Sequence, residues 1–372
     1  KPQTATGRRA SGHTASTRSA AGLGQRLREY FLSPLEPIPS EERIRFTKLD
    51  LCLLLAIGIL YSCFALYDLG DRKAPTTTYD MSGELQAIEL EFPEDALPVT
   101  MASYLAPWHQ RHFGMDVKSN AEDSWTYLGE IILNNVFTWQ DVSLQDLLTQ
   151  ATENSTSDMS ATTRYLSLTD NDASLIELVF LDANGNITRP LNADAYPTLF
   201  DESDLYPERY SFRNSMYFDE IYHARTAYEF LHGLPTYENT HPPLGKIFIA
   251  LGVAIFGMNP FGWRIMGTLF GIAMLPFIYL LGKKMTRNTP AAALACFLFA
   301  FDFMHFTQTR IATIDVYITF FVIAMYYFMY YYCSMSFYDT PLYKTFVPLG
   351  LCGICMGLGI ASKWTGIYAG CG

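Results

Sequence analysis

The residues of this sequence that could do chemistry begin with an acidic pair. Asp219 and Glu220 are adjacent at the start of a predicted amphipathic helix that ends before Gly233. Successive helical residues point about 100° apart, so only one of the two carboxylates can face a given substrate. That carboxylate could act as general base for an attacking hydroxyl group. The alternative is structural: both acids would cap the helix and interact favourably with its dipole.

Two histidines stand close to this pair in the sequence. His223 follows Asp219 by four residues and lies on the same face of the helix. It could orient the carboxylate, or the two side chains could share a metal ion. No third ligand stands at a suitable spacing, so we predict no metal and no other cofactor. His241 precedes Pro242 and Pro243, which stiffen the backbone. Its ring could contact a substrate or only hold the turn, and both interpretations stay open.

Three cations and one further carboxylate accompany apolar runs. Arg264, Arg310 and Lys363 stand where a long basic side chain either reaches the membrane surface or binds an anion. Asp315 lies just inside an apolar run, where a carboxylate without a partner is costly. We expect Arg310, five residues earlier, to be that partner. The pair would either hold a loop in place or organise a substrate.

Apolar runs must position these residues. Five runs are predicted to cross a membrane: 49–67, 261–282, 291–306, 314–332 and 346–368. The shorter run 247–257 is predicted to lie in the membrane interface, because the basic cluster 283–287 would otherwise face outside. With this topology the acidic pair, the histidine turn and the loop 309–315 all meet on the external side.

The charges are segregated along the 372 residues, whose formal net charge is −11. Residues 1–48 carry nine Lys or Arg against four Asp or Glu, whereas residues 68–217 carry eight against twenty-five. The basic segment, predicted to be a disordered tail, therefore belongs in the cytoplasm and the acidic block outside. This composition excludes a basic nucleic-acid-binding protein.

The segment 79–210 is predicted to be a soluble β-sandwich outside the membrane. Short alternating stretches occur at 85–92, 127–133, 165–168 and 175–181, and polar turns separate them. The segment contains no cysteine, so it needs no disulfide framework. The order of its elements from Trp125 to Gly185 resembles a discoidin-type jelly roll. Such domains often bind glycans, while many only pack against a neighbouring domain.

Four motifs, taken in order, carry a second resemblance. They are Phe218-Asp219-Glu220, His241-Pro-Pro-Leu-Gly-Lys246, Thr309-Arg310-Ile-Ala-Thr-Ile-Asp315 and Gly359-Ile-Ala-Ser-Lys363-Trp364. Together they resemble the protein O-mannosyltransferases and their bacterial relatives, the polyprenyl-phosphate-sugar-dependent glycosyltransferases of the GT-C membrane fold. The likeness covers 49–67 and 217–372, about the N-terminal half of such an enzyme. The long block before Asp219 departs from the short connection usual in that family.

The resemblance implies a multi-span α-helical membrane protein with an inserted extracellular β-sandwich. It implies transfer of a sugar, mannose as the first to test, from a polyprenyl phosphate to a Ser or Thr hydroxyl of an exported protein by inverting displacement. Asp219 would be the base, and Glu220 would be the second residue of the catalytic pair. At least two of Arg264, Arg310 and Lys363 would hold the carrier phosphate. The alternatives are transfer to a glycolipid or cell-wall polymer, and a non-catalytic membrane anchor that displays a glycan-binding domain.

The predicted organisation is that of a multi-pass plasma-membrane protein whose active site and insert face outside. Its parts are a cytoplasmic tail (1–48), a first transmembrane helix (49–67), the β-sandwich (79–210), an external catalytic loop with an interfacial helix (217–257), and four further transmembrane helices cut short at the C-terminal end (261–372). The expected partners are the lipid-linked sugar, the acceptor, the bilayer and a glycan at the β-sandwich, with no nucleic acid.

Overall fold

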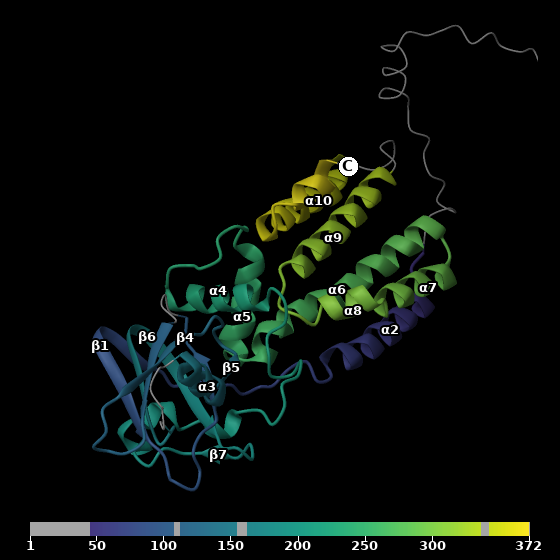
Figure 1. Cartoon of the computed structure of the whole chain (residues 1–372). Helices are drawn as coiled ribbons and strands as arrows, with labels where there is room; N and C mark the ends of the chain where they lie inside the picture. The colour runs from purple at the N-terminus through teal and green to yellow at the C-terminus, as the bar shows by residue number, and fades with distance from the viewer. Residues whose placement is uncertain (1–44, 108–111, 155–161, 336–341, 372) are drawn as a thin grey trace, which may run out of the picture.

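The computed structural model describes residues 45–107, 112–154, 162–335 and 342–371. It has two parts, a β insert and a bundle of apolar helices (Figure 1). Helices α4 (Glu220–His232) and α5 (Leu244–Phe256) lie at the junction between them. The predicted cytoplasmic tail falls almost wholly outside the described residues.

Four helices among the described residues are long and apolar enough to cross a membrane. They are α2 (Lys48–Leu66), α6 (Pro260–Thr286), α9 (Asp315–Cys333) and α10 (Leu342–Ser362). They coincide with four of the five predicted spans, so the predicted multi-span helical fold is confirmed. A short helix, α11 (Gly366–Cys371), follows α10. Helix α5 has 13 residues, about 20 Å at 1.5 Å per residue, and falls short of a hydrocarbon core of about 30 Å.

The span predicted over 291–306 is two helices instead of one. Helix α7 (Thr289–Ala300) ends near Phe301, and α8 (Phe303–Gln308) begins directly afterwards. The break has a local cause, because the Asp302 carboxylate caps α8 by accepting the backbone N–H groups of Met304 and His305. After α8 the chain reaches the first part of α6, where the Thr268 hydroxyl donates to the Thr309 carbonyl at 3.0 Å.

The insert is an antiparallel β structure organised around one long strand. Strand β6 (Tyr165–Leu181) pairs with β1, β2, β3 and β7, and joins all seven strands into one hydrogen-bonded network. The separate strands predicted at 165–168 and 175–181 are thus the two halves of β6. The jelly-roll resemblance stays a prediction. The other elements are β1 (Tyr79–Glu91), β2 (Thr100–Leu105), β3 (His112–Lys118), β4 (Thr126–Ile132), β5 (Trp139–Ser143), β7 (Ile187–Thr188), α3 (Leu144–Asn154) and three 3₁₀ turns within 193–205.

Alternation of side chains explains how the insert folds. Along β3, Phe113, Met115 and Val117 are buried while their neighbours are not, as expected for a strand with one face in a core. Phe92 and Phe180 meet in that core with ring centroids 4.8 Å apart. The predicted turn after β6 is present, because the Asp182 carboxylate accepts the N–H groups of Asn184 and Asn186.

Candidate active site

Asp219 stands at the N-terminus of α4 with a carboxylate that makes no capping hydrogen bond. The preceding residue, Phe218, has a φ of 54°, a conformation that is strained for a bulky side chain. Burial raises the pKa of Asp219, and the nearby Asp315 raises it further, while Lys363 and His241 oppose the shift. Half-buried and not engaged in capping, this carboxylate is available for proton transfer.

Glu220 has a different environment from its neighbour. Its side chain is fully buried and forms a two-point ion pair with Arg264, at 2.7 Å to Nε and 2.6 Å to Nη2. The backbone N–H groups of Tyr217 and Ala312 donate to the same carboxylate, at 2.8 and 2.9 Å. Glu220 therefore joins the start of α4 to α6 and to the loop before α9. This geometry corrects its assignment as a catalytic residue and gives it a positioning role.

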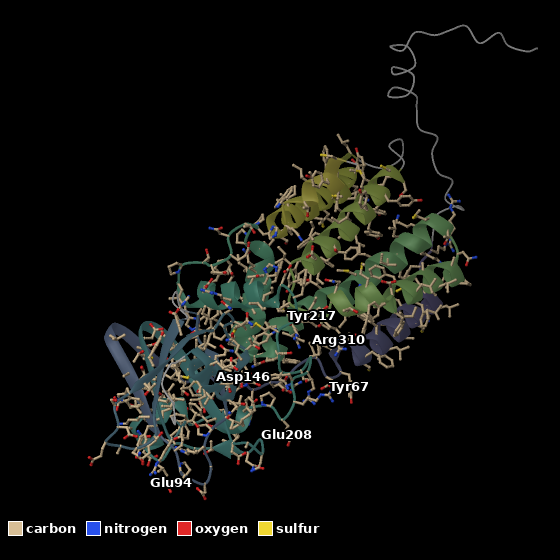
Figure 2. All side chains as sticks on the ribbon, in the orientation of Figure 1. Tyr67, Glu94, Asp146, Glu208, Tyr217 and Arg310 are labelled. Atoms are coloured by element: carbon tan, nitrogen blue, oxygen red, sulfur yellow. The ribbon has the colours of Figure 1, made fainter. Side chains whose placement is uncertain are left out.

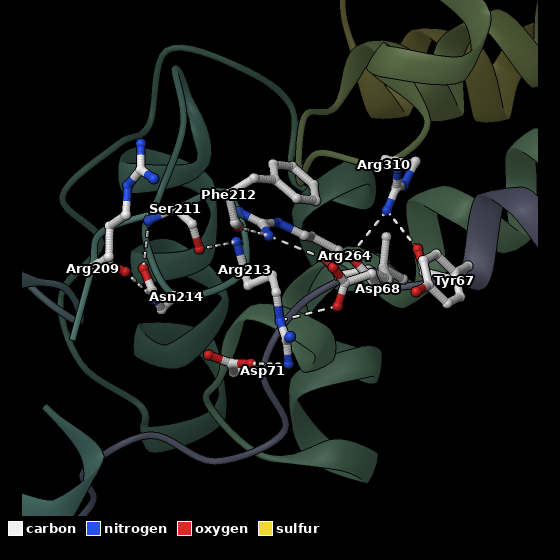
Figure 3. Close-up of polar contacts among 11 residues, drawn as sticks. Tyr67, Asp68, Asp71, Arg209, Ser211, Phe212, Arg213, Asn214, Arg264 and Arg310 are labelled. Carbon is white, nitrogen blue, oxygen red and sulfur yellow. Dashed lines mark hydrogen bonds and ion pairs between the residues drawn. The ribbon is translucent and has the colours of Figure 1, made fainter. Parts of the chain in front are cut away.

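Arg264 has no N–H group left for a phosphate. Besides its two bonds to Glu220, it donates to the carbonyls of Leu69, Phe212 and Ser215, at 3.1, 2.5 and 2.8 Å (Figure 3). A guanidinium has five N–H donors, and these contacts use all five. The side chain is also fully buried. The expectation that Arg264 holds the carrier phosphate is corrected, since its donors are committed within the protein.

Arg310 points to the end of α2 and not to Asp315. Its Nη2 donates to the carbonyls of Tyr67 and Asp68, at 2.7 and 3.0 Å (Figure 3). Its guanidinium also lies 5.3 Å from the ring centroid of Phe212. The predicted pair of Arg310 with Asp315 is therefore wrong.

The partner of Asp315 is Lys363. The Lys363 Nζ atom lies 2.7 Å from the Asp315 carboxylate, which joins the start of α9 to the turn after α10. Both side chains are near enough to Asp219 to affect its pKa, as is His241. The structure thus brings together Asp219, His241, Asp315 and Lys363, and separates them from the group made by Glu220, Arg264 and Arg310.

His223 and His241 each have a buried Nδ1 atom without a hydrogen-bond partner. His223 is only 3% exposed, and burial lowers the pKa of its ring to about 4. The ring is therefore neutral near pH 7. The backbone N–H of His223 donates to the Asp219 carbonyl at 3.1 Å, but its ring Nδ1 has no hydrogen-bond partner, so its predicted orienting role stays a prediction.

The sequence analysis did not identify Glu238 and Lys246 as site residues. Lys246 is 1% exposed, and its Nζ donates to the Glu238 carboxylate and carbonyl at 2.5 and 2.8 Å. Although burial raises the pKa of Glu238, hydrogen bonds from Lys246 and Thr240 lower it to about 2. This pair closes the turn that carries His241. Lys246 belongs to the quoted proline-rich motif, but nothing nearby in the sequence marks Glu238 as its partner.

A cavity of about 420 Å³ lies next to Phe218, the residue that precedes Asp219. Phe218 and Asp315 both line it, and α6, α7, α8 and α9 contribute the remaining walls. Its lining is mainly apolar with a few hydrogen-bonding groups, as is usual for sites that hold a partly apolar ligand. The other lining residues are Met274, Phe299, Asp302, Met304, His305, Gln308, Thr309, Val316 and Thr319.

Within the described part of the chain, one group of acidic residues lies close enough together to hold a metal ion. It consists of Glu177, Asp201 and Glu202, and it belongs to the insert. Two of its carboxylates already accept hydrogen bonds from nearby residues. The Ser203 hydroxyl donates to Glu177 at 2.6 Å, and the Thr76 N–H donates to Glu202 at 2.6 Å. The prediction of a metal-independent site around Asp219 stays a prediction.

Comparison with known proteins gives one family and several relatives. Residues 255–371 match the family model of the dolichyl-phosphate-mannose-protein mannosyltransferases. The polyprenol-phosphate-mannose–protein mannosyltransferase of Mycobacterium tuberculosis is 29% identical over 179 residues, which cover 41% of this chain and 33% of the relative. The enzyme of the same name from Mycolicibacterium smegmatis is 30% identical over 177 residues, with the same coverage. That from Corynebacterium glutamicum is 33% identical over 84 residues, 23% of this chain and 16% of the relative.

The chain spans about a third of the length of the curated relatives that it matches most extensively. No solved structure matches it significantly. The family match includes Arg264, Arg310, Asp315 and Lys363, and it begins after Asp219. The family match contains two of the four motifs, those at 309–315 and 359–364. Through this membrane part, the chain is similar to the protein O-mannosyltransferase family.

Proposed function

We propose that the protein to which this chain belongs transfers mannose from a polyprenyl phosphate to a Ser or Thr hydroxyl of an exported protein. The reaction would take place on the external face of the plasma membrane. The observation that carries the proposal is the Asp219 carboxylate, which makes no capping hydrogen bond and lies close enough to Asp315 and Lys363 to feel their charges. Asp315 and Phe218, the residue before Asp219, both line the cavity. The relatives are named for the same donor and for a protein acceptor.

The chemistry is a single displacement at the anomeric carbon. The acceptor hydroxyl oxygen forms a bond to C1 of the sugar, the bond from C1 to the phosphate oxygen breaks, and the hydroxyl proton passes to Asp219. The leaving group is a phosphate anion, so no general acid is required, in contrast to glycoside hydrolysis. A carboxylate with a raised pKa keeps a higher proton affinity, which suits a base.

The cavity and Lys363 suit the donor. The mainly apolar walls of the cavity would accept the first isoprene units. Lys363 gives one N–H to Asp315 and retains two donors that can neutralise a phosphate. Arg310 donates to the carbonyls of Tyr67 and Asp68 and lies apart from this group, so we assign the phosphate to Lys363 alone.

The test uses membranes that contain the full-length protein, supplied with labelled polyprenyl-phosphate mannose, glucose or galactose and with a Ser/Thr peptide. We expect mannosyl peptide from the wild type. Asp219→Asn should reduce the rate by roughly 10²–10⁴-fold, the usual contribution of a general base. Product on lipid or polysaccharide would replace the proposed acceptor. Full activity of Asp219→Asn would exclude the assigned base and favour the non-catalytic alternative.

We also propose a glycan-binding role for the far end of the insert. A groove of about 640 Å³ lies there, beside Glu94, and is lined by hydrogen-bonding side chains that include Gln145, Thr149 and Asn184. Figure 2 places Glu94 at the opposite end of the insert from Tyr217, so this groove is separate from the reaction centre. Binding of the full-length protein to an array of glycans, compared with Gln145→Ala, tests this role. Equal binding by both would exclude it.

A further inference from the structure

Helix α4, which begins next to Asp219, packs against both parts of the molecule. Ala224 and Ala227 are fully buried in an apolar cluster with residues of α5, α6 and α9. Tyr228, the next residue, packs against the core of the β insert. Met216 and Met258 contact both cores. The helix is therefore an element through which the insert and the membrane helices touch.

One contact between the insert and this helix is made by a strained loop residue. Phe137, between β4 and β5, lies with its ring centroid 4.7 Å from that of Tyr228 and is 3% exposed. Its φ of 56° is unfavourable for an aromatic residue. The backbone N–H of Phe137 donates to the Leu105 carbonyl at 2.9 Å, which holds the ring in this position.

The segment that leads into Asp219 is tied to the insert as well. The Tyr210 hydroxyl donates to Asp141 on β5 at 2.5 Å. Five residues later, the Ser215 carbonyl accepts from Arg264 on α6. The chain that enters α4 is thus held by the insert at one end and by the membrane part at the other. A domain that only displayed a glycan-binding surface would need neither this connection nor the contact of Phe137.

We propose that the β insert is a positioning domain for the reaction centre. Phe137, acting through Tyr228, sets the place of α4 and thereby the place of Asp219 relative to Asp315 and the cavity. The family match starts at residue 255 and does not include the insert, so the family does not supply this role. This inference rests on the proposed function only in those tests that measure sugar transfer.

The first test measures how transfer depends on pH in the full-length protein. Asp219 is faced by Asp315 from α9, by Lys363 after α10, and by Glu238 and His241 from the turn before α5. Phe137→Ala lets α4 move away from these groups and towards solvent. We expect kcat to fall roughly 10- to 100-fold, as for a misplaced catalytic group. The acid limb, which is the decline of kcat at low pH, should move to lower pH because Asp219 becomes less buried. The KM for the lipid donor should change less than kcat.

The matched control removes an equal ring from the same core. Phe92→Ala leaves a cavity beside Phe180, away from α4, and should destabilise the insert without moving the acid limb. Tyr228→Phe keeps the ring and should behave as wild type. If Phe137→Ala does not accumulate in membranes, Tyr228→Ala removes the same contact from the other side. The inference is overturned if the acid limb does not move in whichever of Phe137→Ala and Tyr228→Ala accumulates. It is also overturned if the acid limb moves equally in Phe92→Ala.

A second readout does not require transfer at all. Amide hydrogen exchange over residues 220–232 reports how firmly α4 is held. We expect faster exchange there in Phe137→Ala and no change in Phe92→Ala. Absence of transfer by the wild type would refute the proposed function alone. Unchanged exchange in Phe137→Ala would refute the positioning role alone.

Discussion

At the scale of single residues, the proton affinity of Asp219 results from opposing neighbours. Burial and the Asp315 carboxylate raise its pKa, while Lys363 and His241 lower it. Transfer requires the deprotonated base, so activity should decline as the pH falls through that raised pKa. The ion pair of Asp315 and Lys363 thus places one negative and one positive neighbour beside the Asp219 carboxylate.

Replacing the two members of that pair should move the acid limb of kcat/KM in opposite directions. Asp315→Asn removes a negative neighbour and lowers the pKa of Asp219, so the limb moves to lower pH. Lys363→Met removes a positive neighbour, so the limb moves to higher pH. Rates of mannosyl transfer between pH 4 and pH 8 measure both. Movement in the same direction would show that these residues do not act through Asp219.

Arg264 should behave as a structural residue and not as a phosphate ligand. Arg264→Lys leaves several buried acceptors unpaired, including the Glu220 carboxylate, and breaking a buried pair costs about 3–5 kcal/mol. Thermal unfolding in detergent measures this loss. The control is Arg213→Gln, which breaks exposed ion pairs with Asp68 and Asp71 and should cost about 1 kcal/mol or less. A variant of Arg264 with wild-type stability and a raised donor KM would restore the phosphate role.

Sequence reasoning identified which residues gather at the site better than it identified their partners. Asp219, His241 and Asp315 could be placed on one side of the membrane by topology alone, whereas Lys363 lies inside the predicted run 346–368. The pair of Glu220 with Arg264 spans 44 residues and has no local signal. The Arg310 side chain turns towards the carbonyls at the end of α2, which depends on the folded loop.

At the scale of elements, the close approach of α5 to the loop before α9 brings the histidine turn to the site. Gly245, in the first turn of α5, makes this approach possible. A Cβ atom there would lie 2.8 Å from Cγ2 of Ile314 and 3.4 Å from the Ser362 carbonyl. These two residues immediately precede Asp315 and Lys363, so the glycine lets α5 rest against both members of the ion pair.

Gly245→Ala should therefore destabilise the protein and reduce transfer. Alanine normally stabilises a helix relative to glycine by about 1 kcal/mol, so a lower melting temperature would identify steric displacement. Gly350→Ala on α10 is the matched control, since a Cβ there meets nothing within 4 Å. Thermal unfolding and transfer rates should separate the two variants. Equal behaviour would mean that the contact with Ile314 relaxes freely.

The elements differ in how far their sequences reveal them. Helices α2, α6, α9 and α10 follow from long apolar runs, since little else stabilises such runs in lipid. The break between α7 and α8 could not be read from hydropathy, because it depends on the cap formed by Asp302. Strand β6 was divided in the prediction, because its polar middle, 169–174, looks like a turn until its pairing with β1 is known.

At the scale of the whole molecule, the β insert should lie outside the membrane and the C-terminal end of α6 should lie in the cytoplasm. Asn184 lies in the exposed turn after β6, and Met285 is exposed in the last turn of α6. In intact cells, a membrane-impermeant maleimide should label Asn184→Cys. Met285→Cys should react only after permeabilisation. The unsubstituted protein gives the background of its seven cysteines. The reverse pattern would invert the proposed orientation.

The five acceptors around Arg264 also constrain how the protein is made. Leu69 precedes the insert in the chain, whereas Phe212, Ser215 and Glu220 follow it. Arg264 itself is synthesised later and would carry unsatisfied donors within the bilayer boundary until these groups are in place. The insert must therefore bring its two ends together before α6 can settle. An insert that misfolds would leave an exposed arginine at the membrane, a feature by which the cell's membrane proteases could recognise the defective chain.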